Sequence, residues 1–158
     1  MPEQSQTAQQ LVPVRLLGAP VRLWERSREY HEGLTREFAL LALGDPESRH
    51  VPARLLNLVS DVSREYGAFT HDAEAQLARA RSVGSVTVDL EYHVPPGVVP
   101  HARALMELLD QADRFCAAGD LLTLTTPEAV RAFRTWYFGE FTRQPVGEPP
   151  TPWQGPLW

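Results

Sequence analysis

The 158-residue chain contains no lysine, and all 15 of its basic residues are arginine. Without lysine, the chain cannot form a Schiff base with a carbonyl substrate, and it lacks the lysine of a Walker phosphate loop. Its sequence has no glycine-rich phosphate loop between a strand and a helix and no Gly-x-Ser-x-Gly motif. These absences argue against several common classes of enzyme.

Cysteine and long apolar segments are also scarce. The single Cys116 cannot form an internal disulfide, and the longest apolar run, 38–43, is far shorter than the roughly 20 residues that cross a bilayer. Residues 1–6 have neither a basic start nor an apolar stretch, so they do not look like a secretory signal. The net charge of −5 disfavours a nucleic-acid partner. We therefore expect a cytoplasmic protein that binds neither nucleic acid nor a membrane.

Residues that could carry a reaction do not cluster along the chain. A metal site needs ligands at defined spacing, whereas the histidines fall in five separate segments, at His31, His50, His71, His93 and His101. Asp89 and Glu91 share one face of a predicted strand, but no proton donor can be placed beside them. Cys116 falls on the apolar stripe of a predicted helix, where a buried thiol is expected. We predict no enzyme, and no catalytic, cofactor-binding or metal-binding residue.

Composition divides the chain into three parts. Residues 1–11 are polar and rich in glutamine, which predicts a disordered arm. Residues 12–144 have the length and apolar content of a single globular domain. Residues 145–158 are rich in proline and carry two tryptophans, Trp153 and Trp158, which predicts an extended tail.

Hydrophobic periodicity within 12–144 predicts a helix-dominated α+β fold with about five helices and a small three-stranded sheet. Strands are expected at 21–24, 86–94 and 121–124, with 12–17 as a further candidate strand. Helices are expected at 27–43, 52–66, 70–81, 98–117 and from a capping box at 125–128 to about 141. The order is β-α-α-α-β-α-β-α. The helical crossover between the last two strands favours parallel pairing, so a small α/β sandwich is the alternative class.

The last predicted helix has more aromatic residues than one buried stripe needs. Five aromatics lie within nine residues, at Phe133, Trp136, Tyr137, Phe138 and Phe141. Either the proline-rich tail covers the surplus rings or they contact another protein. Arginines on the same helix could steer an acidic partner. The predicted partner-binding residues are therefore Arg131, Arg134, Trp136, Phe138, Arg143, Trp153 and Trp158.

An acidic row follows the preceding helix. Glu107, Asp110 and Asp113 recur at i, i+3 and i+6, opposite the apolar stripe. Such a row can present an acidic patch to an arginine-rich partner, but it is more often the solvated side of an amphipathic helix. We expect the solvated side.

Several segments resemble a group of small uncharacterised actinobacterial proteins. The residues that carry the resemblance are 20–24 (PVRLW), 27–38 (SREYHEGLTREF), 86–92 (VTVDLEY) and 120–128 (DLLTLTTPE), and the similarity covers most of 12–153. Members of that group are encoded with STAS-type anti-sigma-factor antagonists, anti-sigma kinases and phosphatases of the PP2C type. The resemblance implies a role near partner-switching control of transcription. It supplies no catalytic residue, and this chain lacks the nucleotide-binding boxes of the anti-sigma kinases.

Our first functional hypothesis is a non-enzymatic regulatory protein that binds another protein, such as a component of an anti-sigma system. The alternative is a small-molecule sensor with a closed, mainly apolar pocket between sheet and helices, whose polar groups would include Tyr92, His93 or Arg22. An enzyme with an unfamiliar site ranks third. Homodimerisation is compatible with all three.

Overall fold

The computed structural model of the chain describes residues 10–44, 50–119 and 125–158. These residues form five α-helices and a two-stranded antiparallel sheet. In chain order the elements are β1 (Val12–Pro20), α1 (Val21–Leu43), α2 (His50–Tyr66), the 3-10 turn η2 (Gly67–Phe69), α3 (His71–Ser82), β2 (Thr87–Val94), α4 (Val98–Ala118), α5 (Glu128–Arg143) and the 3-10 turn η4 (Gln144–Val146). The predicted class, helix-dominated α+β, is confirmed.

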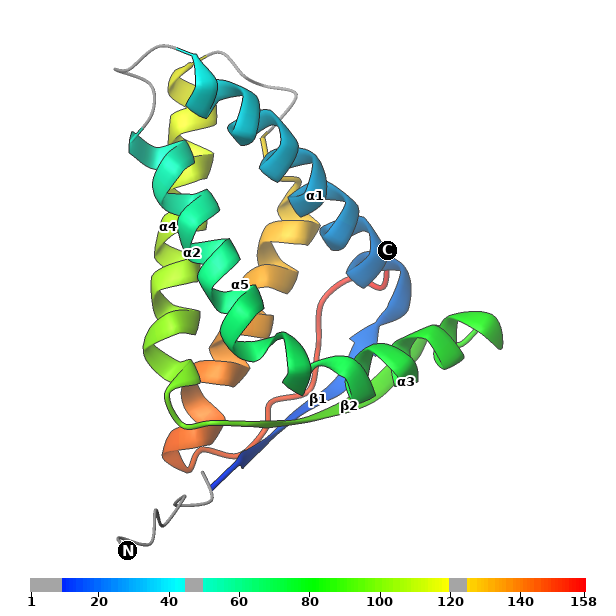
Figure 1. Ribbon diagram of the computed structural model, residues 1–158. Coiled ribbons are helices and arrows are strands. Elements are labelled where there is room, and N and C mark those ends of the chain that lie inside the picture. The colour runs from blue at the N-terminus through cyan, green and yellow to red at the C-terminus, as the bar shows by residue number, and fades with distance from the viewer. Residues whose placement is uncertain (1–9, 45–49, 120–124) are drawn as a thin grey trace, which may run out of the picture.

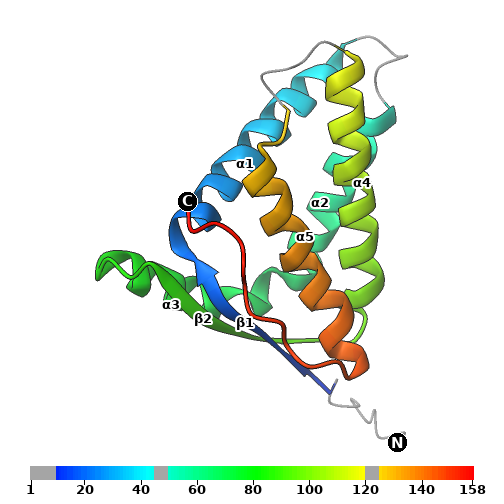
Figure 2. The same ribbon diagram turned by 180° about the vertical axis from the view of Figure 1, so that it is seen from behind.

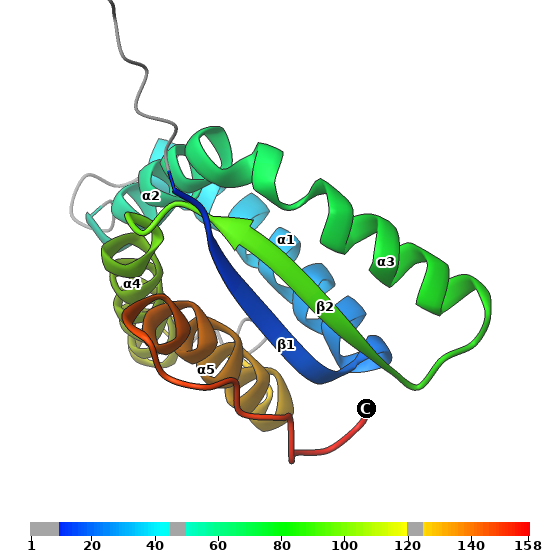
Figure 3. The ribbon, with the colours of Figure 1, turned by 90° about the horizontal axis from the view of Figure 1, so that it is seen from below.

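The long helices α1, α2, α4 and α5 pack against one another, and the sheet lies across one end of this group together with α3 (Figure 1). Seen from that end, α3 flanks β2 and α5 flanks β1 (Figure 3). The C-terminal segment runs back along α5 and ends near the start of α1 (Figure 2). Segments far apart in sequence therefore meet around α5.

The sheet buries one face and exposes the other, as the period of two in β2 predicts. The side chains that face each other across its inner side are all buried, namely Val14, Leu16, Leu90 and Tyr92. The pairing register shifts between Leu16 and Ala19. Gly18 lies within this irregularity with a φ of 67°, a left-handed conformation that glycine adopts without steric cost, and its N–H donates to Asp89 at 2.8 Å.

The prediction of a strand at 21–24 is wrong, because these residues form the first turn of α1. Val21 and Leu23 are both buried, a pattern that a strand and the start of a helix share. The strand lies one segment earlier, at Val12–Pro20, where only a candidate strand was expected. Ser27, at which the helix was expected to begin, is instead buried within α1.

The other predicted elements have mixed outcomes. The strand at 86–94 is confirmed as β2, and α2, α3 and α4 lie close to their expected positions. The N-cap of α5 is Pro127 and makes no side-chain capping bond, so the expected capping box at 125–128 is wrong. The expected strand at 121–124, with its parallel pairing, lies outside the described residues.

The apolar core has two main parts. One lies between the inner face of the sheet, α3 and the C-terminal half of α5. The other joins α1, α2 and α4 and includes Phe38, Leu109 and Cys116. Cys116 is fully buried, as predicted, and burial raises the pKa of its thiol. Within the described ranges, no helix is long and apolar enough to span a membrane.

Candidate functional site

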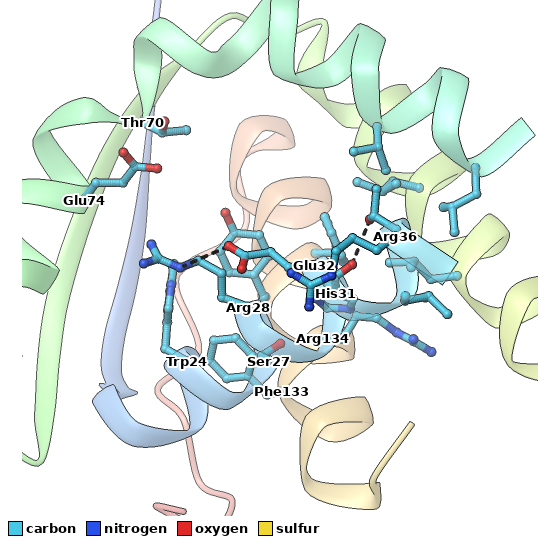
Figure 4. A pocket seen from close by; sticks show the side chains of 18 of the residues that line it. Trp24, Ser27, Arg28, His31, Glu32, Arg36, Thr70, Glu74, Phe133 and Arg134 are labelled. Atoms are coloured by element: carbon cyan, nitrogen blue, oxygen red, sulfur yellow. Dashed lines mark hydrogen bonds and ion pairs between the residues drawn. The ribbon is translucent and has the colours of Figure 1, made fainter. Parts of the chain in front are cut away.

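A pocket of about 680 Å³ opens between the two parts of the core. Its walls come from α1, α2, α4 and α5, with residues of β2 and α3 at one end (Figure 4). Most of the lining is aliphatic or aromatic and includes Trp24, Leu34, Leu55, Val59, Leu105, Leu109, Phe133 and Phe138. The volume falls within the range of about 300–1,000 Å³ that is typical of small-molecule sites.

Exposed charged side chains surround this pocket, and their charges balance. Arg28, Glu32 and Arg36 come from α1, and Glu74 comes from α3. The Nε of Arg28 lies 3.9 Å from Oε1 of Glu32, one helical turn away (Figure 4). The two arginines and two glutamates sum to zero, so these exposed groups give the pocket no net charge.

Arg134 is a buried cation in the pocket wall. It belongs to α5, and its side chain is 0% exposed. Its Nη2 donates to Oδ1 of Asp110 at 2.8 Å and to Oδ2 of Asp113 at 2.6 Å, both on α4. A buried guanidinium requires such partners, because burying an ion without a partner costs roughly several kcal/mol.

Asp113 extends this ion pair into a network that joins three helices. The hydroxyl of Thr126, just before α5, donates to Asp113 and contacts the hydroxyl of Tyr30 on α1 at 2.9 Å. The Nε of Arg131 lies 3.8 Å from the same carboxylate. The network therefore ties α1, α4 and α5 together behind the pocket.

Two nitrogens of Arg134 remain without a partner in this network. Nε and Nη1 are buried and make no hydrogen bond in the structure, and the same holds for Nε2 of His31 on α1. Both residues line the pocket. Burial and the nearby charge of Arg134 lower the pKa of His31 to about 4, so the ring is neutral at pH 7. Buried polar atoms nearly always have partners, so these three nitrogens mark a place where a polar group is expected.

A pair of tyrosines lines the pocket near the sheet. Tyr92 comes from β2 and Tyr137 from α5. Burial raises the pKa of both, that of Tyr137 to about 12, and the charge of Glu74 adds to each increase. The hydroxyls therefore stay protonated and can act as neutral hydrogen-bond donors or acceptors.

The structure resolves where the surplus aromatic residues of α5 go. Nε1 of Trp136 donates to the carbonyl of Thr151 at 2.7 Å, and the backbone N–H of Trp153 donates to the carbonyl of Leu17 at 3.0 Å. The ring of Trp153 packs edge-on against Phe133 and Trp136, with centroids 5.9 and 5.4 Å away. The tail thus covers part of the aromatic face of α5, which was one of the two expected alternatives.

A buried carboxylate anchors the tail. Glu140 of α5 is 1% exposed and accepts hydrogen bonds from the side chain of Gln144 at 2.6 Å and from the N–H of Thr151 at 3.1 Å. Arg143 completes this arrangement by pairing with Glu140. Gln144 also exchanges two hydrogen bonds with the backbone of Arg15 in β1, of 2.8 and 2.7 Å. The end of α5, the tail and the sheet therefore form one connected unit.

The predicted partner-binding residues fall into different environments. Arg134 is buried, and Phe138 is half-buried in the lining of the pocket. Arg143 is tied to Glu140 and to Glu148 at 3.3 Å. Trp136 of α5 contacts Trp153 of the tail. The two most exposed members of the set are Arg131, at 51%, and Trp158, at 70%.

Sequence reasoning missed most of the pocket residues. The acidic row is not wholly solvated, because Asp113 is 12% exposed and faces Arg134. Of the polar groups named for the alternative pocket, Tyr92 lines this pocket, whereas Arg22 and His93 lie elsewhere, with His93 beside Glu91 at 3.1 Å. The pocket is bordered by exposed charged residues and is not closed, whereas that alternative predicted a closed pocket. One signal for the pocket was present in the sequence. His31 follows Ser27 by four residues, so the two side chains lie on the same face of α1.

Neither a metal centre nor a relative identifies this site. In the part of the chain that the structure describes, no three His, Cys, Asp or Glu residues come together as metal ligands would. Comparison with protein families, curated proteins and solved structures gave no significant match. Function must therefore be argued from the geometry of the pocket itself.

Proposed function

We propose that this protein is a regulatory protein whose pocket binds a small, mainly apolar molecule. The observation that carries the proposal is the pocket of about 680 Å³ with apolar walls and three buried nitrogens, on Arg134 and His31, that have no partner. An apolar body would be stabilised by the walls, and one polar group would satisfy these nitrogens. No nucleophile is required for this role, so the proposal is a sensor and not an enzyme.

The pocket also suggests how a ligand would act on the fold. Its lining residues belong to six elements, including helices from both parts of the core. A molecule that bridges them stabilises the bound conformation by mass action, by about 2.7 kcal/mol at a concentration 100 times the Kd. Occupancy would thereby be converted into a change in the surface that α1, α2 and α3 present to a partner.

A pocket-filling substitution tests the proposal. Val59→Trp places a large ring into the pocket from the half-exposed face of α2, whereas Val62→Trp, one turn further along, makes the same change outside the lining. Compounds that raise the Tm of the wild-type chain should also stabilise Val62→Trp and should not stabilise Val59→Trp. The screen would use small apolar metabolites, and extracts of the purified chain would be analysed by mass spectrometry. Equal stabilisation of both variants would refute the pocket as the binding site.

Protein binding is the second candidate function, and the exposure of Trp158 favours it. This ring is 70% exposed at the end of the packed tail, beside two arginines and two glutamates of α1, namely Arg22, Glu25, Arg26 and Glu29. Large exposed aromatic residues are enriched at interfaces. A role in anti-sigma partner switching would place a STAS-domain protein or its kinase at this surface. A two-hybrid assay with both kinds of partner, comparing the full chain with Trp158→Ala, tests this candidate.

A further inference from the structure

We propose that the ligand of the pocket is a neutral molecule that carries a carbonyl oxygen on an apolar body, such as an ester, ketone or lactone, and not a carboxylate. This inference rests on the proposed function and adds the chemical class of the ligand. It follows from which atoms of Arg134 are already paired and which are not.

The unpaired atoms in the wall require an acceptor. The Nε and Nη1 of Arg134 carry only N–H groups, so they can donate hydrogen bonds but cannot accept them. His31 is neutral and one of its ring nitrogens can act as a further donor. A carbonyl oxygen has two lone pairs, so it can accept from Arg134 and, when the proton of His31 is on Nε2, from His31 as well. A hydrocarbon would leave these donors unsatisfied.

The charges around Arg134 disfavour an anion. Its Nη2 already lies 2.8 Å from one carboxylate and 2.6 Å from another, those of Asp110 and Asp113. A ligand carboxylate would be a third negative charge around one guanidinium. Arg131 offsets only part of this charge, because it is half exposed and 3.8 Å from Asp113.

The remaining groups of the pocket give no further positive charge to compensate. The charges of Arg28 and Arg36 are matched in number by those of Glu32 and Glu74, which leaves these exposed residues neutral in sum. The two tyrosine hydroxyls stay protonated, and the other polar lining residues, Ser27, Thr35 and Thr70, carry no charge. A carboxylate would lose its hydration without gaining an unshared cation. A neutral carbonyl compound loses far less on entering.

A matched set of probes separates these possibilities. Methyl octanoate has a neutral carbonyl, octanoate has the same chain with a charge, and nonane is a similar chain without oxygen. Each would be titrated against the full chain carrying a neutral naphthylamine dye, whose displacement is followed by fluorescence. Methyl octanoate should bind at least about ten-fold more tightly than either of the others, because hydrogen bonds from a charged donor contribute about that factor or more.

Removing the charged cluster as a unit tests the role of Arg134 without leaving a buried charge unpaired. In Asp110→Asn/Asp113→Asn/Arg134→Met the affinities for methyl octanoate and nonane should differ by no more than about two-fold. Arg131→Met, which leaves Arg134 and its two partners in place, should keep the full preference. The inference is overturned if the triple variant also keeps that preference, or if octanoate binds as tightly as its ester.

Failure of the proposed function has a different signature. If the dye and all three probes bind equally well to the wild-type chain and to Val59→Trp, the pocket is not where they bind and both proposals fail. If the probes bind the wild-type chain and not Val59→Trp, but without preference for the ester, the pocket function stands and the ligand class is wrong.

Discussion

Replacing Arg134 by methionine tests how far this one side chain holds the helices together around the pocket. The substitution keeps much of the side-chain volume and removes the charge that faces Asp110 and Asp113. Breaking a buried ion pair by removing one partner typically costs about 3–5 kcal/mol. Asp110 is 52% exposed and can be rehydrated, whereas Asp113 is only 12% exposed. We therefore expect a loss near the lower end, about 3 kcal/mol.

Urea unfolding of the full chain, followed by circular dichroism, measures this loss directly. For a domain of this size, about 3 kcal/mol corresponds to a decrease in Tm of roughly 6–12 °C. Arg131→Met is the matched control, because Arg131 approaches the same carboxylate from a half-exposed position, and it should cost less than about 1 kcal/mol.

The variant in which Asp110 and Asp113 are also neutralised should recover most of the stability, because no buried charge is then left unpaired. A loss below about 1 kcal/mol for Arg134→Met would show that the network contributes little. A triple variant as unstable as the single variant would show that packing of the arginine stem, not its charge, accounts for the effect.

Two further predictions concern the tail and His31. Trp153→Ala should lower the free energy of unfolding by about 2 kcal/mol, less than for a fully buried tryptophan, because Trp153 is half-buried against Phe133 and Trp136. Trp158→Ala removes a ring that is 70% exposed and should change the free energy of unfolding by less than about 0.5 kcal/mol. Equal losses of stability in the two variants would contradict the packing of the tail. Because the folded-state pKa of His31, about 4, lies below its ordinary value of 6.5, the unfolded chain binds more protons between these values, and stability should fall as the pH drops from about 6.5 to about 4. Denaturation at a series of pH values should show a flatter profile for His31→Leu, and an unchanged profile would refute the burial of a neutral ring.

Two variants that would seem suited to a test of partner binding also remove contacts of the packed tail. Trp136→Ala and truncation after Glu148 would each remove a predicted partner-binding residue, but they would also disturb the fold. Trp136 and Thr151 are bonded to each other, and Thr151 also bonds to the buried Glu140. Both changes should therefore reduce stability, so Trp158→Ala is the cleaner test of partner binding.

Local periodicity was sufficient to predict the elements whose burial pattern fits one structure only. In β2, buried and exposed residues alternate over the whole strand, and in α4 the apolar residues repeat at helical spacing up to Gly119. Such patterns arise because one face of each element is buried, whatever covers it. The pattern of residues 21–24 does not distinguish a strand from a helix, because burial of Val21 and Leu23 alone occurs in a strand and in a helical turn alike.

Contacts between distant segments decided the rest. An acidic row on a helix is the same in sequence whether it faces water or a buried arginine, and only the approach of α5 places Arg134 against Asp113. The tail was recognisable as extended, but the surface that it covers depends on Glu140 and on the carbonyl of Leu17. The pocket needs residues from six elements at once. By itself, the sequence determined the class of fold and most of the helices, because these depend on residues that are neighbours in the chain. The tertiary structure alone decided the pocket, its buried donors and the surface on which the tail packs. Each of these exists only where separate elements converge.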